Sequence, residues 1–458
     1  MSPTTSRRPS RVVILVDNKR RDLLSCALIA HHLEQRGARV FLEPLEAYRA
    51  VLGAHQPDLI LFNHLLASHL ASYSAQLRER GVQVAVLPNE ALLYNPEVLR
   101  FNCRRYNDRV HVDLYLCWSE QQRTALLANG YDPAVTRMAV VGNPKFDLHF
   151  APWHRLFPVQ AASSRPRLLF CTNFALARFH ELPPAAADKF FDIWRKHVAD
   201  YADYRTAIAV NHRSRARLVD FLGAVVAANQ FEIVIRPHPS EAREFYHHWL
   251  AGLPATARQH MRLDEHALIY GPVRECDLEI SCETCTTAID SWLAGKPTIE
   301  LTFDQHPMFA HAEVAGLNVT CADPARLVPT ILEQLADPAQ NPLQAARHRH
   351  LAKWCATPSG HSAELTAEAI LASLASHETH PSPLSLADRR RGWKLRALAL
   401  SNLPYHFDPL LPVKAGLFPS RYASKRHTWE KSITPQLAAQ ARASIAAVAR
   451  LASAFRQL

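Results

Sequence analysis

The sequence has no long apolar run: no stretch approaches the roughly 18 consecutive apolar residues that a membrane-spanning helix needs. The basic start, MSPTTSRRPSR, is followed only by VVILV before Asp17 interrupts it, which predicts a core strand and not a signal peptide. The sequence also lacks an Asp-x-Asp motif, internal repeats and low-complexity runs. Any contact with a membrane is therefore expected to be peripheral.

What is present is an ordinary globular composition. The chain has 458 residues, 48% hydrophobic and 21% charged, so two or more packed domains are expected. A net charge of +10 points to an acidic partner, which is a nucleic acid, a phosphorylated small molecule or an anionic membrane. The nine cysteines are odd in number and scattered, which favours free thiols in a reducing, cytoplasmic compartment.

Short apolar runs alternate with helical patterns through most of the chain. Continuous apolar strands separated by helices predict parallel sheets that are covered on both faces. We therefore predict an α/β protein with two Rossmann-like doubly wound domains, residues 1–155 and 165–380, and a ligand cleft between them. A basic, aromatic and helical tail is predicted for residues 381–458. The predicted strands are VVILVD, RVFLEP, LILFN, VQVAVLP, DLYLCWS and MAVVG in the first domain, and RLLFCTNF, FEIVIRP, ALIYG, DLEIS and PTIEL in the second.

A hydroxyl-rich turn within DLEISCETCTTAIDSWLAGKPTIEL (277–301) joins a predicted strand to a helix. Ser281, Thr286 and Thr287 are candidate phosphate contacts, because hydroxyls beside the unpaired N–H groups of a helix start favour an anion. Asp290, one turn later, is a candidate contact for a ribose hydroxyl. The alternative is that these hydroxyls only cap the helix.

The second signal is FEIVIRPHPSE (231–241), in which a buried strand delivers Arg236 and His238 to its carboxyl end. Arginine offers a planar fork of donors and histidine a donor that can become cationic, so the pair suits a phosphate ester. The alternative is a structural turn with a surface arginine.

No metal site is predicted. Cys282 and Cys285 form a C-x-x-C pair, but a zinc site needs about four ligands and no second pair lies nearby. Adjacent histidines such as His31-His32 and His247-His248 fall in helical segments that we expect to be exposed.

The RPHP turn at 236–239, followed by S-x-x-x-x-T-T-A-x-[DE]-x-x-x-x-G-K-P at 281–297, resembles the donor-binding half of GT-B glycosyltransferases. More narrowly, residues 11–375 resemble bacterial surface-carbohydrate biosynthesis proteins, with further similarity to retaining β-Kdo transferases and CDP-glycerol glycerophosphotransferases. Supporting segments are LVDNKRRD, PNEALLYN, FNCRRYND, VVGNPKFD, CTNFALA and TPSGHSAE.

This resemblance implies that the second domain holds a nucleotide-sugar donor and the first domain holds the acceptor. It further implies metal-independent transfer without a cofactor, with CMP-Kdo as the preferred donor and a surface polysaccharide or lipid-linked glycan, as in lipopolysaccharide or capsule, as the acceptor. Asn173 is a candidate contact for the donor or the reacting sugar. Asn143 and Lys145 are candidate contacts for donor or acceptor, whereas Gly142 and Pro144 are expected to shape the crossover between domains.

The catalytic carboxylate is assigned to Glu90, with Asp17 as the second choice. Each follows a strand of the first domain and should face the cleft, where an inverting enzyme needs a general base and a retaining one a nucleophile. Alternatively, Asp17 caps the helix that begins near Asp22, and Glu90 pairs with Arg104 or Arg105.

Residues 389–431 contain ten Lys or Arg against two acidic residues, a net charge of +8, and six aromatic residues are interleaved with them. This pattern suits an anionic bilayer or lipid-linked acceptor at the inner face of the cytoplasmic membrane. Nucleic acid is a formal alternative, but no recognised motif accompanies the charge. The other alternative is an extension that packs back on the first domain, and a final helix after Thr434-Pro435 is expected to cover the protein with its apolar face.

The function predicted from these features is a glycosyltransferase that works on an activated sugar. The alternatives are a UDP-N-acetylglucosamine 2-epimerase-type enzyme, which shares the scaffold and needs no acceptor, a CDP-glycerol-type glycerophosphotransferase, and a non-catalytic subunit of a polysaccharide-assembly complex. Turnover of the donor alone distinguishes an epimerase from a transferase.

Overall fold

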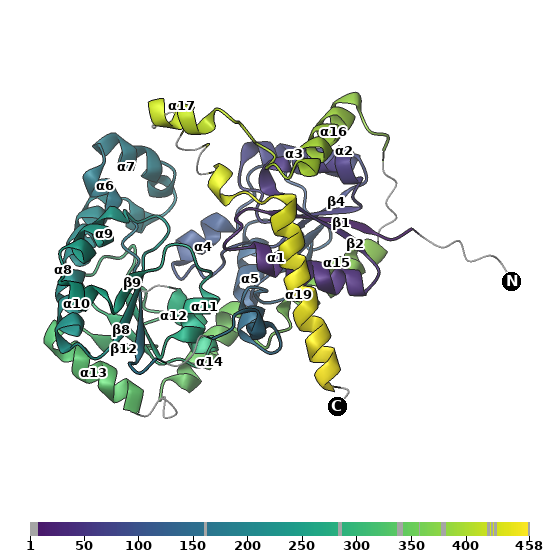
Figure 1. The fold of residues 1–458 in the computed structure, drawn as a ribbon. Helices are drawn as coiled ribbons and strands as arrows, with labels where there is room; N and C mark the ends of the chain where they lie inside the picture. Colours follow the sequence, from purple (N-terminus) through teal and green to yellow (C-terminus); the bar gives the residue numbers. More distant parts are fainter. Residues whose placement is uncertain are drawn as a thin grey trace. The chain divides into compact units, whose positions relative to one another are not determined.

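Figure 1 shows the computed structural model of the chain, which describes residues 8–159, 163–282, 286–336, 342–356, 358–376, 382–418, 422, 425 and 428–456. The chain forms two compact units. The first unit comprises Met1–Leu92, Asn102–Leu156 and Ala352–Leu458, and the second comprises Leu93–Phe101 and Phe157–Leu351.

The first unit contains a six-stranded parallel sheet in the order β2-β1-β3-β4-β5-β6. β1, β3, β4 and β5 are buried along nearly their whole length, as expected for strands covered on both faces. The chain adds β2 on one side of β1 and then β3 on the other, so the switch point lies between β1 and β3. The strands are β1 (Arg11–Val16), β2 (Arg39–Pro44), β3 (Leu59–Phe62), β4 (Gln83–Val86), β5 (Leu114–Cys117) and β6 (Arg137–Val140).

The second unit contains another six-stranded parallel sheet, in the order β12-β11-β10-β7-β8-β9. β7, the first strand in the chain, is central, with β8 on one side and β10 on the other. This is the Rossmann strand order, with its switch point between β7 and β10. The strands are β7 (Arg167–Cys171), β8 (Glu232–Arg236), β9 (Met261–Leu263), β10 (Leu278–Cys282), β11 (Thr298–Leu301) and β12 (Val319–Cys321).

Helices connect and cover both sheets, so the predicted class of two Rossmann-like doubly wound domains with a helical C-terminal region is confirmed. The helices of the first unit are α1 (Leu23–Gln35), α2 (Val51–His55), α3 (Ser68–Glu79), α5 (Glu120–Ala128), α15 (Ser362–Ala375), α16 (Leu386–Leu400), α17 (Leu411–Leu417) and α19 (Pro435–Arg456). Those that lie in or begin in the second unit are α4 (Pro96–Asn102), α6 (Arg178–Glu181), α7 (Pro184–Phe191), α8 (Tyr204–Ala228), α9 (Glu244–Ala251), α10 (Ala255–Arg258), α11 (Tyr270–Glu275), α12 (Thr287–Leu293), α13 (Pro324–Ala336) and α14 (Gln344–Cys355).

One predicted strand is wrong. ALIYG (267–271) leads into α11, whose buried residues Tyr270, Pro272 and Val273 lie on one side of a single helical turn. An apolar run this short fits a buried strand or a buried helix equally well. The edge strand of this sheet is instead β9, which spans only three residues and is partly exposed, so it left little pattern to recognise.

The chain returns to the first unit after α14, whereas the sequence placed residues up to 380 in the second domain. α15 packs on α1, and its first N–H groups, those of Ser362 and Ala363, donate to Asp147 at 3.1 and 2.7 Å. The predicted domain ranges 1–155, 165–380 and 381–458 stay a prediction.

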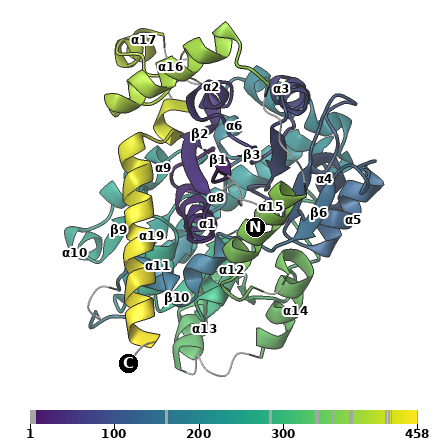
Figure 2. The same cartoon turned by 90° about the vertical axis from the view of Figure 1, so that its right-hand side faces the viewer.

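The C-terminal tail packs on the first unit. α19 lies beside α1, and Ala438, Ala441, Ile445 and Val448 are buried along its inner face (Figures 1 and 2). The expected apolar face is buried at Ala441, Ile445 and Val448, whereas Leu451 of that face is 54% exposed. None of the helices in the described part of the chain is both long and apolar enough to cross a bilayer.

Candidate active site

Three segments leave the second sheet at its carboxyl edge. β7, β8 and β10 are parallel neighbours, so the segments that follow them leave the sheet on the same side. These segments carry Asn173, His238 and Thr286 respectively. The sequence predicted each as a donor contact, and the strand order brings the three to one edge at the switch point.

The RPHP turn after β8 is held by internal contacts. Arg236, its first residue, forms an ion pair with Asp264 Oδ2 at 2.5 Å. Burial acts to raise the pKa of Asp264, but backbone N–H groups and the Arg236 guanidinium bring that pKa below its ordinary value. The His238 ring accepts a hydrogen bond at Nδ1 from Ser240 N at 3.1 Å, so the neutral ring carries its proton on Nε2.

Glu241 fixes this turn to the loop after β7, and sequence reasoning missed it. Its Oε1 accepts hydrogen bonds from Thr172 Oγ1 at 2.7 Å and from the backbone N–H groups of Phe174 and His238 at 3.0 Å. Its Oε2 accepts one from the Tyr246 hydroxyl. The side chain is nearly inaccessible, and burial raises its pKa. The only sequence signal was an acid three residues after His238 in a proline-rich turn.

The hydroxyl turn after β10 is organised around Glu279, a second buried carboxyl that the sequence did not single out. Ser281 Oγ donates to Glu279 Oε1 at 2.7 Å, and Thr287 Oγ1 donates to the same oxygen at 3.2 Å. Burial raises the pKa of Glu279 to about 8, so this carboxyl is mostly protonated at neutral pH. Thr286 is exposed, so it is the hydroxyl of the predicted three that faces solvent.

The remaining predicted residues of this region lie on the segments that follow β7 and β10. Asn173 lies two residues after β7 and Asp290 in the first turn of α12, and both are partly buried. Cys282 is a buried free thiol at the end of β10, whereas Cys285 lies outside the described residues. Within the described ranges, no group of three His, Cys, Asp or Glu side chains is arranged to hold a metal ion.

The two predicted catalytic carboxylates of the first unit share one arginine. Arg21 Nη2 contacts Asp17 Oδ2 at 2.8 Å, and its Nη1 contacts Glu90 Oε1 at 3.0 Å. Arg21 also pairs with Asp22 through Nε at 2.9 Å. These acids raise the pKa of Arg21 despite its burial. The shared cation therefore brings Asp17 and Glu90 together through a residue that the sequence did not single out, and Glu90 pairs with Arg21 where the sequence offered Arg104 or Arg105.

The C-terminal tail supplies a second cation to Asp17. Lys431 Nζ lies 2.6 Å from Asp17 Oδ1, and the backbone carbonyl of Lys431 accepts a hydrogen bond from Lys19 N at 2.9 Å. Burial acts to raise the pKa of Asp17, but Lys431 and Arg21 lower it below its ordinary value. Asp17 is thus an ionised carboxylate with a cation on each oxygen, whereas the side chain of Glu90 is 70% exposed.

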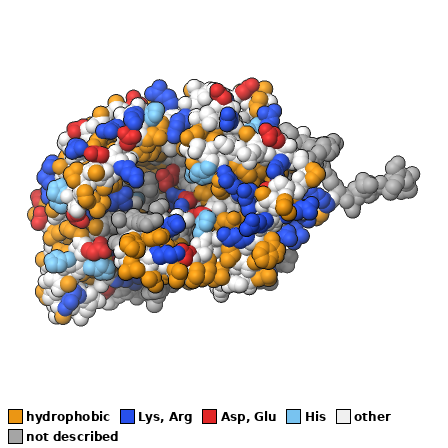
Figure 3. All heavy atoms as spheres, turned by 90° about the horizontal axis from the view of Figure 1, so that it is seen from above, with side chains coloured by type: hydrophobic (Ala, Val, Ile, Leu, Met, Phe, Trp, Pro, Cys, Tyr) orange, Lys and Arg blue, Asp and Glu red, His pale blue; other side chains and the backbone are white. Residues whose placement is uncertain are grey.

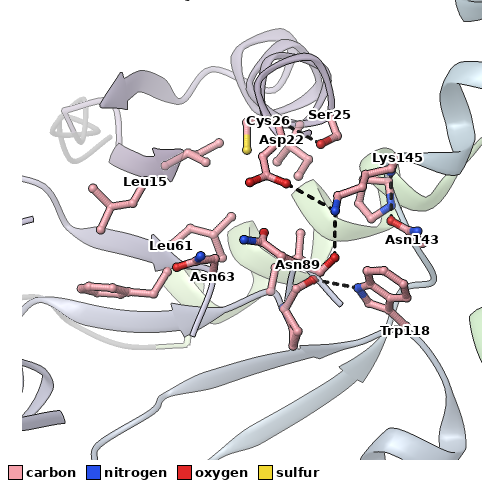
Figure 4. A pocket seen from close by; sticks show the side chains of 16 residues that line it. Leu15, Asp22, Ser25, Cys26, Leu61, Asn63, Asn89, Trp118, Asn143 and Lys145 are labelled. Atoms are coloured by element: carbon pink, nitrogen blue, oxygen red, sulfur yellow. Dashed lines mark hydrogen bonds and ion pairs between the residues drawn. The ribbon is translucent and has the colours of Figure 1, made fainter. Parts of the chain in front are cut away.

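A small cavity lies behind this cluster (Figure 4). Its volume is about 30 Å³, enough for a water-sized group, and it is lined by the carboxyl ends of β1, β3 and β4 and by α1. Lys145 Nζ donates to Asn89 O at 2.8 Å and lies 3.3 Å from Asp22 Oδ1 (Figure 4). Burial lowers the pKa of Lys145. Its ammonium group therefore holds the peptide that precedes Glu90.

No protein-family model matches the chain, and no curated protein matches it. Similar solved structures include MnaA from S. aureus in complex with UDP, which is 11% identical with a TM-score of 0.47 and covers 82% of this chain and 100% of its own. Another is the UDP-GlcNAc 2-epimerase from Neisseria meningitidis bound to UDP-GlcNAc, at 11% identity, a TM-score of 0.42 and coverages of 79% and 100%. Alr3699/HepE from Anabaena in complex with UDP-glucose is 13% identical, with a TM-score of 0.40 and coverages of 79% and 99%. At these levels of similarity, the assignment to the doubly wound α/β class rests on the order and direction of the strands.

Proposed function

We propose that this protein is a metal-independent glycosyltransferase of the GT-B type that transfers a sugar from a nucleotide-sugar donor to a glycan acceptor. One observation carries the proposal: the strand order gathers His238, Asn173 and the exposed hydroxyl of Thr286 at the switch point of the second sheet. In doubly wound folds this edge is where ligands bind. CMP-Kdo is the preferred donor on resemblance, and a surface polysaccharide or lipid-linked glycan is the preferred acceptor.

The second sheet would hold the phosphate groups of the donor. His238 presents Nε2–H as a donor, and Thr286 adds a hydroxyl on the other side of β7. Arg236 forms an ion pair with Asp264, so we assign it to a supporting position that uses its remaining N–H groups. Because the pKa of Glu279 is about 8, the carboxyl beneath the hydroxyl turn adds little negative charge at neutral pH to repel a phosphate.

Glu90 is the stronger candidate for the chemical step, and Asp17 for positioning. A general base must reach the acceptor hydroxyl, and a nucleophile must reach the sugar carbon. Glu90 is exposed and pairs with Arg21 through Oε1, whereas Asp17 is 17% exposed with a cation on each oxygen. Arg21 would hold the two carboxylates in place.

Single substitutions test the donor site. A hydrogen bond to a charged group is worth about 1.5–3 kcal/mol, so His238→Ala and Thr286→Ala should each weaken nucleotide binding by about tenfold or more. Binding is measured by calorimetry, after a thermal-shift screen of CMP, UDP, GDP and CDP has shown the preferred nucleotide. His348→Ala, an exposed histidine on α14, is the matched control. Unchanged binding in both site variants would refute the assignment.

Glu90→Gln tests the chemical step separately. This variant should retain nucleotide affinity but lose transfer, because the amide cannot accept a proton or attack the sugar. Product analysis with the donor alone is the accompanying control. Turnover without acceptor would identify an epimerase, and nucleotide binding without turnover across a broad set of donors and acceptors would identify a non-catalytic subunit.

The acceptor proposal also places the enzyme at the inner face of the cytoplasmic membrane. Its support is the charge of the tail, +8 within residues 389–431, against +2 for the other residues of the chain. Arg421 and Arg426, which contribute to this charge, lie outside the described residues.

A further inference from the structure

α16 is fixed to the first unit along one side. It crosses α2 at a pair of glycines, Gly53 and Gly392, where a Cβ on either residue would come within 2.3 Å of the other segment (Figure 2). Asp388, at the start of α16, forms an ion pair with Arg80 and a capping box with Ser385. These contacts determine which side of α16 faces outward.

The outward side carries a row of large apolar side chains. Leu386, Trp393 and Leu400 are spaced seven residues apart, two turns of a helix, so they lie along one side of α16. They are 84%, 73% and 91% exposed. Large apolar side chains this exposed, in a line, mark an interaction surface and not a part of the core.

Cations lie between and beside these apolar side chains. Arg389 and Arg390 lie between Leu386 and Trp393, and both are exposed. The acidic residue of α16, Asp388, is buried and faces the body of the unit. Figure 3 looks onto the side of the molecule where Figure 1 places α16 and α17, and it shows Lys and Arg side chains interspersed with hydrophobic ones. The row is therefore both apolar and strongly basic.

α17 repeats the pattern on a second segment of the tail. Leu410, Val413 and Leu417 follow helical spacing and are 57%, 61% and 68% exposed, and Phe418 after them is 56% exposed. Leu411 and Ala415, on the opposite side, are buried. α17 thus presents its own apolar row while its inner side packs on the protein.

A cavity of about 610 Å³ lies beside the row on α16. Its lining includes Arg80, Arg389, Arg396 and Trp393. Arginine forks suit phosphate oxygens, and an indole ring suits the boundary between polar head groups and acyl chains. The cavity has the size and charge to take the phosphate-bearing head group of a lipid.

We propose that the outward sides of α16 and α17 form a docking surface for an anionic lipid bilayer, with the cavity beside Trp393 receiving a phospholipid head group. A protein partner would favour an apolar centre depleted of charge. Here each apolar side chain of α16 has cations beside it, which suits a layer where acyl chains and phosphates lie a few ångströms apart. This surface deepens the proposed function, since it places the enzyme beside a membrane-bound acceptor, but its test requires no sugar donor.

Vesicle co-sedimentation of the full-length protein tests the apolar row. Wild-type protein should bind vesicles of phosphatidylcholine with phosphatidylglycerol, and bind vesicles of phosphatidylcholine alone far more weakly. The triple variant combines Leu386→Ser, Trp393→Ser and Leu400→Ser. It should bind the anionic vesicles at least tenfold more weakly than the wild type, because each methylene group buried in the bilayer adds to the free energy of binding. The matched control, with Leu127→Ser, Val135→Ser and Leu182→Ser, changes residues that are 42%, 51% and 46% exposed elsewhere and should bind like the wild type.

Arginine variants test the electrostatic part and the head-group cavity. Arg389→Gln and Arg390→Gln should each weaken binding to the anionic vesicles by about fivefold, since a cation near such a surface is worth about 1 kcal/mol. Soluble glycerol phosphate at millimolar concentration should compete poorly, because it offers a phosphate without acyl chains. Thermal unfolding of every variant confirms that the fold is intact. The proposal is overturned if the wild type does not bind anionic vesicles, if the folded triple variant binds as well as wild type, or if glycerol phosphate abolishes binding.

Discussion

Two carboxyls at the carboxyl edge of the first sheet and two in the corresponding region of the second are held in opposite ways. In the first unit, Asp17 and Glu90 are ionic and share the cation of Arg21. In the second unit, Glu241 and Glu279 are buried, and the contacts that hold them come from hydroxyls and backbone N–H groups. The pKa of Asp17 is lowered by its cations, whereas burial raises the pKa of Glu241 and of Glu279.

This difference suits the two proposed tasks. A site for an anionic donor phosphate gains from carboxyls that hold the loops without adding full negative charge. A site for a base or nucleophile gains from ionised carboxylates that remain accessible. Removing a buried carboxyl should therefore cost stability in the second unit, whereas removing an ion-pair partner in the first should cost little.

The largest effect is expected at Glu241. Glu241→Ala would leave the Thr172 hydroxyl and the N–H groups of Phe174 and His238 without this acceptor, whereas the Tyr246 hydroxyl would still have Thr172 Oγ1 at 3.0 Å. Each unsatisfied buried donor costs about 1–3 kcal/mol, so the free energy of unfolding should fall by at least about 3 kcal/mol. Urea unfolding followed by circular dichroism measures it.

Glu241→Gln is the matched control, because its amide keeps the volume and one carbonyl acceptor. It should lose less stability than Glu241→Ala. An ordinary surface substitution changes the free energy of unfolding by less than about 0.5 kcal/mol. If Glu241→Ala lowered it by no more than that, the buried carboxyl would not be holding the loops of the second unit.

The second effect concerns the pH dependence given by Glu279. Its pKa is about 8 in the folded protein and ordinarily 4.5, so the folded state retains a proton that the unfolded state loses. Stability from this group is therefore fully present below about pH 4.5 and is lost as the pH rises toward 8. Glu279→Gln keeps a neutral side chain at every pH. As the pH rises from about 4.5 to 8, the free energy of unfolding of the variant should therefore increase relative to that of the wild type.

Thermal unfolding of the wild type and of Glu279→Gln at pH 5, 6.5 and 8 measures this change in relative stability. The Tm of Glu279→Gln minus that of the wild type should increase steadily along this series. A constant difference would mean that Glu279 ionises normally in the fold, and the hydroxyl turn would then carry a charge as the acid cluster of the first unit does.

Much of the fold followed from periodicity. The continuous apolar runs that became β1, β3, β7 and β10 predicted parallel sheets, because a strand buried on both faces has no polar side. Short or partly exposed elements could not be predicted in this way. β9 has little apolar pattern, and ALIYG fits a strand as well as it fits the start of α11. The return of α15 to the first unit depends on Asp147 accepting from residues more than two hundred positions later.

In the candidate site, too, features formed by neighbouring residues could be predicted, whereas contacts between distant residues could not. The RPHP and hydroxyl turns could be found, because their residues are contiguous and follow apolar strands. Their partners could not: Arg21 meets Glu90 across 69 positions, and Thr172 meets Glu241 across the same number. A single sequence shows which residues can carry charge, but the strand order determines which of them meet.

The smallest effect is expected at Lys431, which joins Asp17 across 414 positions. Lys431→Met removes one cation from a partly exposed pair and leaves Arg21 on the other oxygen, so the free energy of unfolding at pH 7 should fall by less than about 1 kcal/mol. Because the pair lowers the pKa of Asp17 below its ordinary 3.8, its contribution is present above that pH and is lost as the pH falls through the lowered value. The difference between wild type and variant in urea unfolding should therefore shrink from pH 7 to pH 3 and should also shrink in high salt. A loss as large as that of Glu241→Ala would show that the tail is an integral part of the acid cluster. The contrast between the ion-paired Asp17 and the buried, hydrogen-bonded Glu241 would then no longer hold.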